Sequence, residues 1–389
     1  MAPFLRFLKR IVSSDFGIAL VVTLVWKIVM LVIGHWLDVH YGGPIRLLDH
    51  TMHWDAGWYI EIINGHYTTK LATAAFYPLF PLLVYSLQAI SFNVIDYALS
   101  GQIINTIAVW FALVAAIKLG RTLLGNSSRF WIGLLLLSAP AAFFMHVFYG
   151  EALFVALSFW AYYSALKRRW LVVGILLGIL TATRLPSVLI IALCGLEFMR
   201  AYNWNLKKIF NKKLLYFLLA PVGFILFGLY LAIVQHDPLG MFHAYSATND
   251  WSYQLFNLNI FATIWDALYQ TARTVAGVRP MNAGIFVNIM LPVFSILALA
   301  ASSIYLIVKH AKNLLPLGIV GLLSIIMFTL NSNLISVHRY ILPCLALYVA
   351  TALFFAKGKR YFFLFIICLA GLLIQGYLLS LFIKGVFAG

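Results

Sequence analysis

Acidic and aromatic side chains are concentrated in one stretch, residues 53–81, of a chain that is otherwise mostly apolar. The stretch reads HWDAGWYIEIINGHYTTKLATAAFYPLFP and holds two carboxylates, Asp55 and Glu61. A carboxylate can accept the proton of a hydroxyl group, and a flat aromatic ring can stack on the apolar face of a sugar. This combination is typical of a site that acts on a sugar hydroxyl.

Asp55 is the first candidate for a general base. The alternative is that Asp55 caps a short helix over the sequence WDAGWYIEII, because acidic side chains accept backbone N–H groups at helix N-termini. Glu61 lies six residues further on, off the same helix face, and is expected to be a solvated or structural acid. Trp54 and Trp58 would share a helix face and could stack on a sugar, but tryptophan also collects at membrane interfaces in general.

Glu151 is the second acidic candidate. It is expected where two apolar segments meet on the outer side, and an unpaired acid at that depth is costly. A role in the site and an ion pair with a nearby arginine or histidine both remain open. In a second long loop, four side chains could line an acceptor site, although nothing in their spacing requires it. These four are Asp237, His243, Asp250 and Trp251.

No metal site is predicted. Five histidines, at positions 35, 40, 50, 53 and 66, match no HxxxH spacing, so hydrogen-bonding roles are expected for them. Asp38 and Asp49 could be ligands or a second acid, but loop solubility explains them equally well. A dependence on a divalent metal therefore stays open, and no cofactor is assigned.

The composition predicts an integral membrane protein. Of the 389 residues, 63% are hydrophobic and only 10% are charged, whereas soluble domains have roughly 25% charged residues. The apolar segments are about 20 residues long and show no alternation of period two, which favours an all-α polytopic bundle. The net charge of +16 is expected from basic cytoplasmic loops and not from nucleic-acid binding.

About eleven apolar segments are expected to cross the membrane. The segment 76–92 is not counted, because Pro78 and Pro81 make it re-entrant or interfacial. Two short segments are expected to form a hairpin with Arg184 and Pro186 at its tip. The eleven segments lie near residues 16–36, 98–119, 130–148, 151–167, 171–183, 186–200, 214–234, 284–308, 314–332, 338–356 and 361–384.

The distribution of basic residues predicts the orientation. With a cytoplasmic N-terminus, most of the 27 lysine and arginine residues fall in inside segments, as the positive-inside rule requires. The long loops 37–97 and 235–282 then lie on the outer face. We therefore expect one membrane domain over residues 1–389, with no separate soluble domain, in a prokaryotic plasma membrane, or in the endoplasmic reticulum of a eukaryote.

Three motifs of the first outer loop resemble the PIG-V-like mannosyltransferases, which are related to the second mannosyltransferase of GPI-anchor synthesis. They are HWDAGWY at 53–59, GHY at 65–67 and AFYPLFPL at 75–82. That family carries a WDxxWY element in its first outer loop, followed by GY and AFxPLxPL elements. This order after a single span is the most specific part of the resemblance.

Three shorter matches follow in the same order. YGEALF at 149–154 resembles the family's TESLF segment, TRLP at 183–186 its TRP element, and HRY at 338–340 its PRY element. The chain departs from the family at His53, where arginine is common, and at Gly150, where threonine is common. These departures leave the sugar and the acceptor undetermined.

The resemblance implies a GT-C-type bundle with juxtamembrane helices on its outer face, in the first long loop. It also implies inverting transfer of a hexose, mannose in the family, from a polyprenyl-phosphate-linked donor to a glycolipid, glycan or protein hydroxyl on the outer face. The leaving phosphate would need a cation, for which Arg339 is the first choice and Arg184 the second. The catalytic candidates are Asp55 and Glu151. The substrate-binding candidates are His53, Trp54, Trp58, Tyr59, Tyr77, Arg184, Arg339 and Tyr340.

Two other functions remain open. A transporter or flippase of a lipid-linked sugar would suit the high hydrophobicity and Lys27 within the first span. However, the polar residues collect in the outer loops, and the two halves of the chain do not match as transporter repeats do. A non-catalytic subunit of a membrane transferase is the other alternative.

Overall fold

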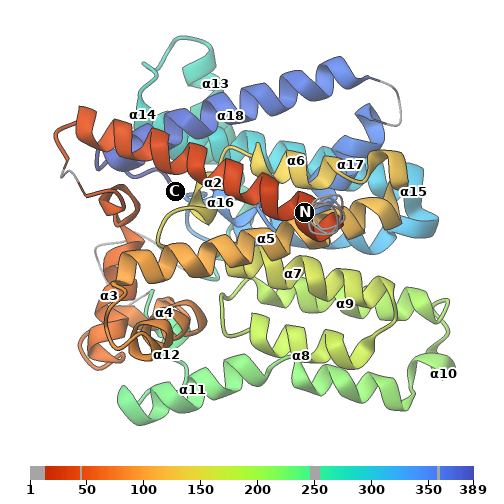
Figure 1. Ribbon diagram of the computed structural model, residues 1–389. Coiled ribbons are helices and arrows are strands. Elements are labelled where there is room, and N and C mark those ends of the chain that lie inside the picture. Colours follow the sequence, from red (N-terminus) through yellow and green to blue (C-terminus); the bar gives the residue numbers. More distant parts are fainter. Residues whose placement is uncertain (1–13, 44–45, 246–254, 357–359) are drawn as a thin grey trace, which may run out of the picture.

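The computed structural model describes residues 14–43, 46–245, 255–356 and 360–389, and all regular secondary structure in these ranges is helical. The longer helices lie side by side along one direction (Figure 1). Short helices from both long loops gather at one end of this bundle. The all-helical architecture predicted from the composition is confirmed for the described part of the chain.

Five segments are long and apolar enough to cross a membrane, so the chain is a multi-pass membrane protein. The predicted number of about eleven spans is not confirmed, because the remaining apolar helices are shorter. The five segments are Asp15–His40 (α2), Tyr97–Leu123 (α5), Lys212–Val234, Ala283–Thr329 and Tyr361–Ile383 (α18). Lys212–Val234 joins the 3-10 helix η5 (Lys212–Leu219) to α11 (Val222–Val234).

The shorter apolar helices complete the bundle. They are α7 (Glu151–Leu166), α8 (Trp170–Leu180), α9 (Ser187–Ala201) and α17 (Leu345–Phe355). Helices α8 and α9 are joined by the turn 181–186, as the predicted hairpin requires. At 1.5 Å per residue, the 11 residues of α8 extend only about 17 Å, which is less than the thickness of the hydrocarbon core.

Proline interrupts two apolar segments near the site. Helix α6 (Trp131–Leu137) ends before Pro140 and is followed by the 3-10 helix η4 (Ala142–Met145). Helix α16 (Val337–Tyr340) is separated from α17 by Pro343. The sequence predicts one continuous span in each segment, and this is wrong because proline lacks the N–H group that would continue the helix. The irregular backbone that results carries several site residues.

Helix α15 (Leu291–Thr329) is a helical hairpin. His310 has non-helical backbone angles, with φ −135° and ψ 22°. A Cβ atom on Gly321 would overlap the hydroxyl of Ser303, although 18 residues of straight helix would separate the two by about 27 Å. The chain therefore folds back at His310 and forms two antiparallel arms, in agreement with the two successive spans predicted there.

The first long loop contains four short helices. Helices η1 (Asp49–Thr51), α3 (Asp55–Gly65) and η2 (Leu71–Ala75) precede α4, which comprises residues Leu79–Ile90. Pro78 is the N-cap residue of α4, and Pro81 lies in its first turn. Proline is tolerated at these positions, because the first N–H groups of a helix have no partner within it. The prolines thus begin a helix that is too short to cross a membrane.

The second long loop contains α12 (Gly240–His243) and α13 (Ile260–Val275), and α14 (Ala283–Ile285) follows it. Helix α12 packs against η2 of the first loop, and α13 packs against α15. The two loops therefore meet at the same end of the bundle.

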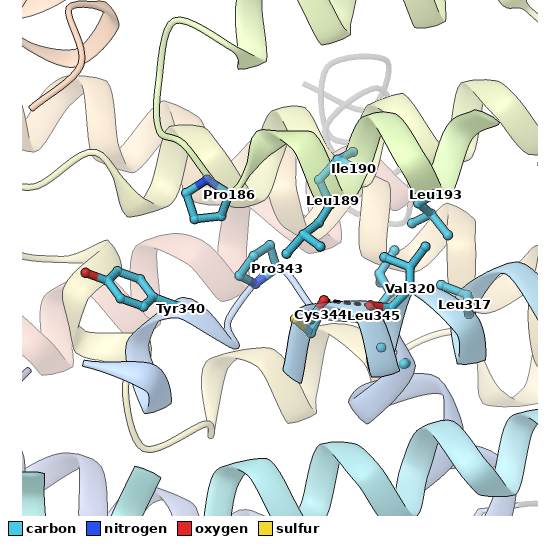
Figure 2. Close-up of a pocket in the computed structure, with 13 residues that line it drawn as sticks. Pro186, Leu189, Ile190, Leu193, Leu317, Val320, Tyr340, Pro343, Cys344 and Leu345 are labelled. Atoms are coloured by element: carbon cyan, nitrogen blue, oxygen red, sulfur yellow. Dashed lines mark hydrogen bonds between the residues drawn. The ribbon is translucent and has the colours of Figure 1, made fainter. Parts of the chain in front are cut away.

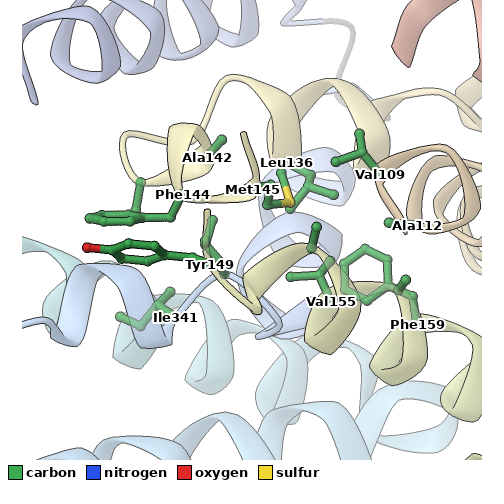
Figure 3. Close-up of a cluster of buried hydrophobic side chains, with 14 of the residues drawn as sticks. Val109, Ala112, Leu136, Ala142, Phe144, Met145, Tyr149, Val155, Phe159 and Ile341 are labelled. Atoms are coloured by element: carbon green, nitrogen blue, oxygen red, sulfur yellow. The ribbon is translucent and has the colours of Figure 1, made fainter. Parts of the chain in front are cut away.

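A buried aromatic cluster supports the irregular segment that follows η4. The rings of Phe144 and Tyr149 are stacked, with 5.4 Å between their centroids and 28° between their planes. Figure 3 shows the two rings stacked face to face, with aliphatic side chains of the core such as Ile341 and Val155 beside them. Both side chains are fully buried. This packing fixes Tyr149 at the edge of the site.

Candidate active site

Both long loops contribute to one cavity of about 490 Å³. Asp55 is the only acidic residue among the described residues that line it, and Arg184 and Arg339 are the only basic ones. A cavity of this size suits a small ligand with a few polar anchor points. Its aromatic wall consists of Trp54, Trp58, Tyr59, Phe76, Tyr77, Tyr245, Phe256, Phe328, Tyr340 and Phe387.

Four charged side chains form a chain of ion pairs in the order Asp55, Arg339, Glu151, Arg184. Nη1 of Arg339 donates to Oδ2 of Asp55 at 2.7 Å. Nε of Arg339 and Nη1 of Arg184 both donate to Oε1 of Glu151. The two positive and two negative charges balance, as groups withdrawn from water require. The structure thus brings together four of the residues selected from sequence.

The side chains at the two ends of this chain of ion pairs are partly exposed, whereas the two in its middle are buried. The Asp55 and Arg184 side chains are 20% and 15% exposed, but those of Arg339 and Glu151 are only 3% and 2% exposed. Glu151 does not line the cavity. Asp55 is therefore the carboxylate that a ligand can reach.

Asp55 is the first residue of α3, and its carboxylate does not cap that helix. The N-cap residue is Trp54, and no side chain makes a capping hydrogen bond. The helix-capping alternative for Asp55 is therefore wrong. Trp54 has a φ angle of +56°, which is costly for a residue with a Cβ atom. This backbone conformation turns the start of α3 towards Arg339.

Tyr149 anchors the start of α3, and the sequence analysis did not select it. Its hydroxyl accepts a hydrogen bond from the backbone N–H of Asp55 at 3.0 Å and donates one to the carbonyl of His53 at 3.2 Å. Its ring also lies beneath the Arg339 guanidinium, 4.6 Å from ring centroid to Cζ. The only signal in the sequence is its place two residues before Glu151.

Glu151 begins α7 and holds two guanidinium groups at once. The alternative in which Glu151 pairs with a nearby arginine is confirmed. Gly150 packs against the first loop, where a Cβ atom would be in ordinary van der Waals contact with Cβ of Phe80, at 3.4 Å, and with the Tyr59 hydroxyl, at 3.5 Å. Glu151 thereby connects α16 to the α8–α9 turn.

Arg339 is held from three sides. Besides its two carboxylate partners, Nη1 donates to the carbonyl of Gly389 at 3.2 Å. Cζ of its guanidinium group lies 4.8 Å from the ring centroid of Phe144 and 4.6 Å from that of Tyr149, within the range of cation–π attraction. Phe387, close to Gly389 in sequence, lines the cavity. Sequence reasoning missed this C-terminal contribution, because residues 384–389 carry no recognisable motif.

Arg184 lies in the turn between α8 and α9, with its guanidinium 5.1 Å from the ring centroid of Tyr340. Among the described residues, its hydrogen bonds use only Nη1, so Nε and Nη2 remain available to a ligand. Arg184 is thus more accessible than Arg339, which reverses the order in which the sequence analysis ranked them as ligand-facing cations.

Four aromatic candidates from the first loop line the cavity, but they differ in exposure. Trp54 is 42% exposed, and Trp58 is stacked on Phe76 with 5.8 Å between ring centroids. Tyr59 and Tyr77 are each only 3% exposed. Burial, reinforced by the neighbouring Glu151 carboxylate, raises the pKa of Tyr59, so this phenol stays neutral. The tryptophans are therefore the better stacking surfaces.

His53 is not among the residues that line the cavity. Its ring packs edge-on against Phe382, with 5.5 Å between centroids. Burial lowers its pKa, and Asp38 opposes this effect. His53 therefore contacts the site through its backbone carbonyl, which receives the Tyr149 hydroxyl.

The remaining polar candidates lie outside the cavity lining. Glu61 forms an ion pair with Lys70 at 3.7 Å, as expected for a structural acid. Oδ2 of Asp237 accepts a hydrogen bond from Nδ1 of His243 at 2.8 Å, and both side chains are partly exposed. Asp250 and Trp251 lie outside the described residues.

Within the described ranges, no three His, Cys, Asp or Glu side chains are placed to share a metal ion. The nearest partner of the Asp55 carboxylate is a guanidinium group and not a second acid. Metal dependence therefore stays an open prediction.

A second, much smaller cavity of about 20 Å³ lies next to the site. Figure 2 shows its apolar lining between α9 and the segment from α16 to α17. Pro186 and Tyr340 line both cavities. The small cavity has no charged lining residue among those described and is too narrow for a sugar.

Comparisons with known proteins found likeness only among solved structures. No family model and no curated protein matches the sequence, so membership of the PIG-V-like family stays a prediction. The chain is similar to the crystal structure of the Archaeoglobus fulgidus oligosaccharyltransferase in complex with zinc and sulfate. The sequences are 14% identical, the match covers 95% of this chain and 53% of that chain, and the TM-score is 0.49. This chain thus spans about half the length of the protein that it matches.

Proposed function

We propose that this chain is a GT-C-type glycosyltransferase that moves a hexose from a polyprenyl-phosphate-linked donor to an acceptor hydroxyl, with inversion. The observation that carries the proposal is that one accessible carboxylate, Asp55, and two guanidinium groups, Arg184 and Arg339, line the same aromatic cavity. A base and a phosphate-binding cation are the two charged groups that such a transfer needs.

Asp55 acts as the general base. Its carboxylate removes the proton of the acceptor hydroxyl while the oxygen attacks the anomeric carbon from the face opposite the phosphate. The hydrogen bond from Nη1 of Arg339 to Oδ2 of Asp55, at 2.7 Å, orients this carboxylate in the cavity. The anomeric carbon–oxygen bond to the phosphate breaks as the new bond forms, which inverts the anomeric centre.

Arg184 receives the leaving phosphate. The departing lipid phosphate gains negative charge, and a guanidinium group can bind two of its oxygens. Arg184 is the accessible member of the pair, and the Glu151 carboxylate fixes its position through Nη1. Arg339, which is more deeply buried, contributes a second positive charge and holds Asp55 in place through their ion pair.

The remaining cavity walls fit a sugar attached to a lipid. Trp54 and Trp58 offer ring faces near the base. Between residues 327 and 336 the wall is largely apolar, apart from Asn331 and Ser336, which suits the first isoprene units of the donor. Its apolar members are Met327, Phe328, Leu330 and Ile335. We propose mannose as the sugar on the resemblance alone, and a glycolipid, glycan or protein hydroxyl as the acceptor.

The proposal is tested with purified protein in liposomes that contain polyprenyl-phosphate-[³H]mannose and membrane extract as the source of acceptor. We expect label to move into an acceptor fraction with inverted anomeric configuration, and no transfer from a nucleotide sugar. Parallel liposomes without acceptor measure whether the donor crosses the bilayer. Movement of the donor across the bilayer without any transfer would favour the flippase alternative and overturn the proposal.

A further inference from the structure

Helix α13 carries its large apolar side chains on the side that faces away from the protein. Phe261, Trp265 and Tyr269 are 88%, 72% and 50% exposed. The side that packs against the bundle instead consists of small side chains. These buried residues are Thr263, Ala267, Thr271 and Thr274. The usual arrangement of a helix on a soluble protein, with its apolar side inward, is therefore reversed.

The exposed side chains are ordered along the helix. Phe261, Trp265 and Tyr269 are spaced by four residues, so they form one continuous stripe. The only charged residues of α13, Asp266 and Arg273, are seven residues apart and lie together on one flank of that stripe. The helix therefore presents one apolar side and one charged flank in addition to its packed side.

The position of α13 in the chain places it at the end of a membrane span. Val275 ends the helix, and the apolar segment Ala283–Thr329 begins eight residues later. Helix α13 packs against the first residues of this segment, η7 (Phe286–Met290), and against α15. The first arm of α15 also exposes large apolar side chains, Phe294 and Leu297.

We infer that α13 is an interfacial helix that lies along the bilayer surface on the side of the two long loops. Its Phe261–Trp265–Tyr269 stripe would enter the boundary between headgroups and acyl chains, and its Asp266–Arg273 flank would face water. Tryptophan and tyrosine favour this depth, because an apolar ring is joined to one polar group. Such a surface left in water would expose an unusually large apolar patch.

The packed side of α13 connects this lipid contact to the cavity. The hydroxyl of Thr263 donates to the carbonyl of Asn331 at 3.3 Å, and Asn331 lines the cavity. Leu255 and Phe256, just before α13, line the cavity as well. Binding of α13 to the bilayer would thus hold one rim of the cavity at the lipid surface. The inference does not depend on the proposed chemistry, since it rests on the exposed side of α13.

The test is the depth of a spin label in liposomes. A nitroxide is attached to Trp265→Cys and, as a matched control on the charged flank, to Asp266→Cys. Background labelling is measured in the unsubstituted chain, whose cysteines 194, 344 and 368 are buried or partly buried. Collision rates with oxygen, which concentrates in lipid, and with a water-soluble nickel chelate are then compared. Tyr269→Cys serves as a second stripe position if Trp265→Cys does not fold.

We expect the ratio of oxygen to nickel collisions to be several-fold higher at position 265 than at position 266. Equal ratios with high nickel accessibility at both positions would show that the stripe faces water and would overturn the inference. Low accessibility of position 265 to both reagents would also overturn it, because the stripe would then be covered by protein, such as a second copy of the chain.

Discussion

At the residue scale, the Tyr149 hydroxyl is expected to set the position of Asp55 without touching the substrate. It bridges the N–H of Asp55 and the carbonyl of His53. Tyr149→Phe keeps the ring beneath Arg339 but removes both hydrogen bonds. We expect the kcat of sugar transfer to fall on the order of tenfold, with little change in the KM for the donor. Kinetics in liposomes measure this, and an unchanged kcat would contradict the anchoring role.

Glu151 is expected to act through the two arginines and not on the substrate. Glu151→Gln removes the charge that compensates both buried guanidinium groups, which is expected to cost about 3–5 kcal/mol of stability. The thermal unfolding midpoint in detergent should therefore drop by many degrees, and Glu61→Gln, which alters an exposed ion pair, should leave it nearly unchanged. A Glu151→Gln protein that is as stable as wild type but inactive would instead assign Glu151 to the chemistry.

The site could be predicted in part from residue types. Asp55 is predicted from its place among aromatic residues, and Glu151 from the cost of a charge in apolar sequence. Arg184 and Arg339 are predicted from the need of a leaving phosphate for a cation. The structure places these four side chains in one chain of ion pairs. Their individual roles could not be derived in this way, because the roles depend on burial. Asp55 and Arg184 are partly exposed, whereas Arg339 and Glu151 are buried. Tyr149 was missed because only its place two residues before Glu151 distinguishes it from the other tyrosines of an apolar, aromatic-rich chain.

At the element scale, a histidine pair joins η1 to η4. Nε2 of His50 lies 3.1 Å from Nε2 of His146, and the two rings are stacked. A Cβ atom on Gly34 would overlap the His50 ring, so α2 packs closely against η1. A hydrogen bond between two Nε2 atoms requires that one of them carries no proton. The contact therefore depends on neutral histidine.

This contact makes stability depend on pH. Burial lowers the pKa of His50 from 6.5 to about 4, with added repulsion from His35, His53 and Lys27. The unfolded chain then binds more protons than the folded one below pH 6.5. The stability that this histidine contributes, up to about 3 kcal/mol, is present above pH 6.5 and is lost as the pH falls towards 4.

We expect the thermal midpoint of the wild type to fall between pH 6.5 and pH 4.5, and His50→Gln to reduce this dependence. His40→Gln, at an exposed position, is the control and should behave like the wild type. Identical pH profiles for His50→Gln and wild type would contradict the assignment.

The helices themselves could be predicted well where proline is absent from their interior. The segments around α2, α5 and α18 were expected within a few residues of their observed bounds. The breaks before η4 and after α16 were not predicted, because the apolar composition continues through Pro140 and Pro343. Hydropathy measures how apolar a segment is, but it does not indicate whether the backbone of that segment can remain helical.

At the scale of the whole molecule, the short helices of the first loop and α10 (Leu206–Ile209) lie at opposite ends of the bundle (Figure 1). The positive-inside rule predicts that the end with the short helices of the first loop faces outward. We expect Thr68→Cys to react with a membrane-impermeant maleimide on intact cells and Lys208→Cys to react only after permeabilisation; both positions are exposed. The reverse pattern would place the cavity on the cytoplasmic side.

The all-helical membrane class could be predicted from the low content of charged residues together with apolar segments of about 20 residues that show no period-two alternation, because a helix satisfies its own backbone hydrogen bonds in lipid. The meeting of Asp55 with Arg339, 284 residues apart in sequence, could not be predicted from spacing. It depends on how the two long loops and α16 pack at one end of the bundle, which no local pattern specifies.

The most direct test of the central claim is sugar transfer by Asp55→Asn, with Glu61→Gln from the same helix as the matched control. Both proteins are compared with wild type in liposomes at equal protein content, with polyprenyl-phosphate-[³H]mannose as donor. We predict that Asp55→Asn lowers kcat on the order of a thousandfold, since the base is lost, while Glu61→Gln stays within about threefold of wild type. Transfer by Asp55→Asn at the wild-type rate would contradict the assignment of Asp55 as the base and the proposed mechanism.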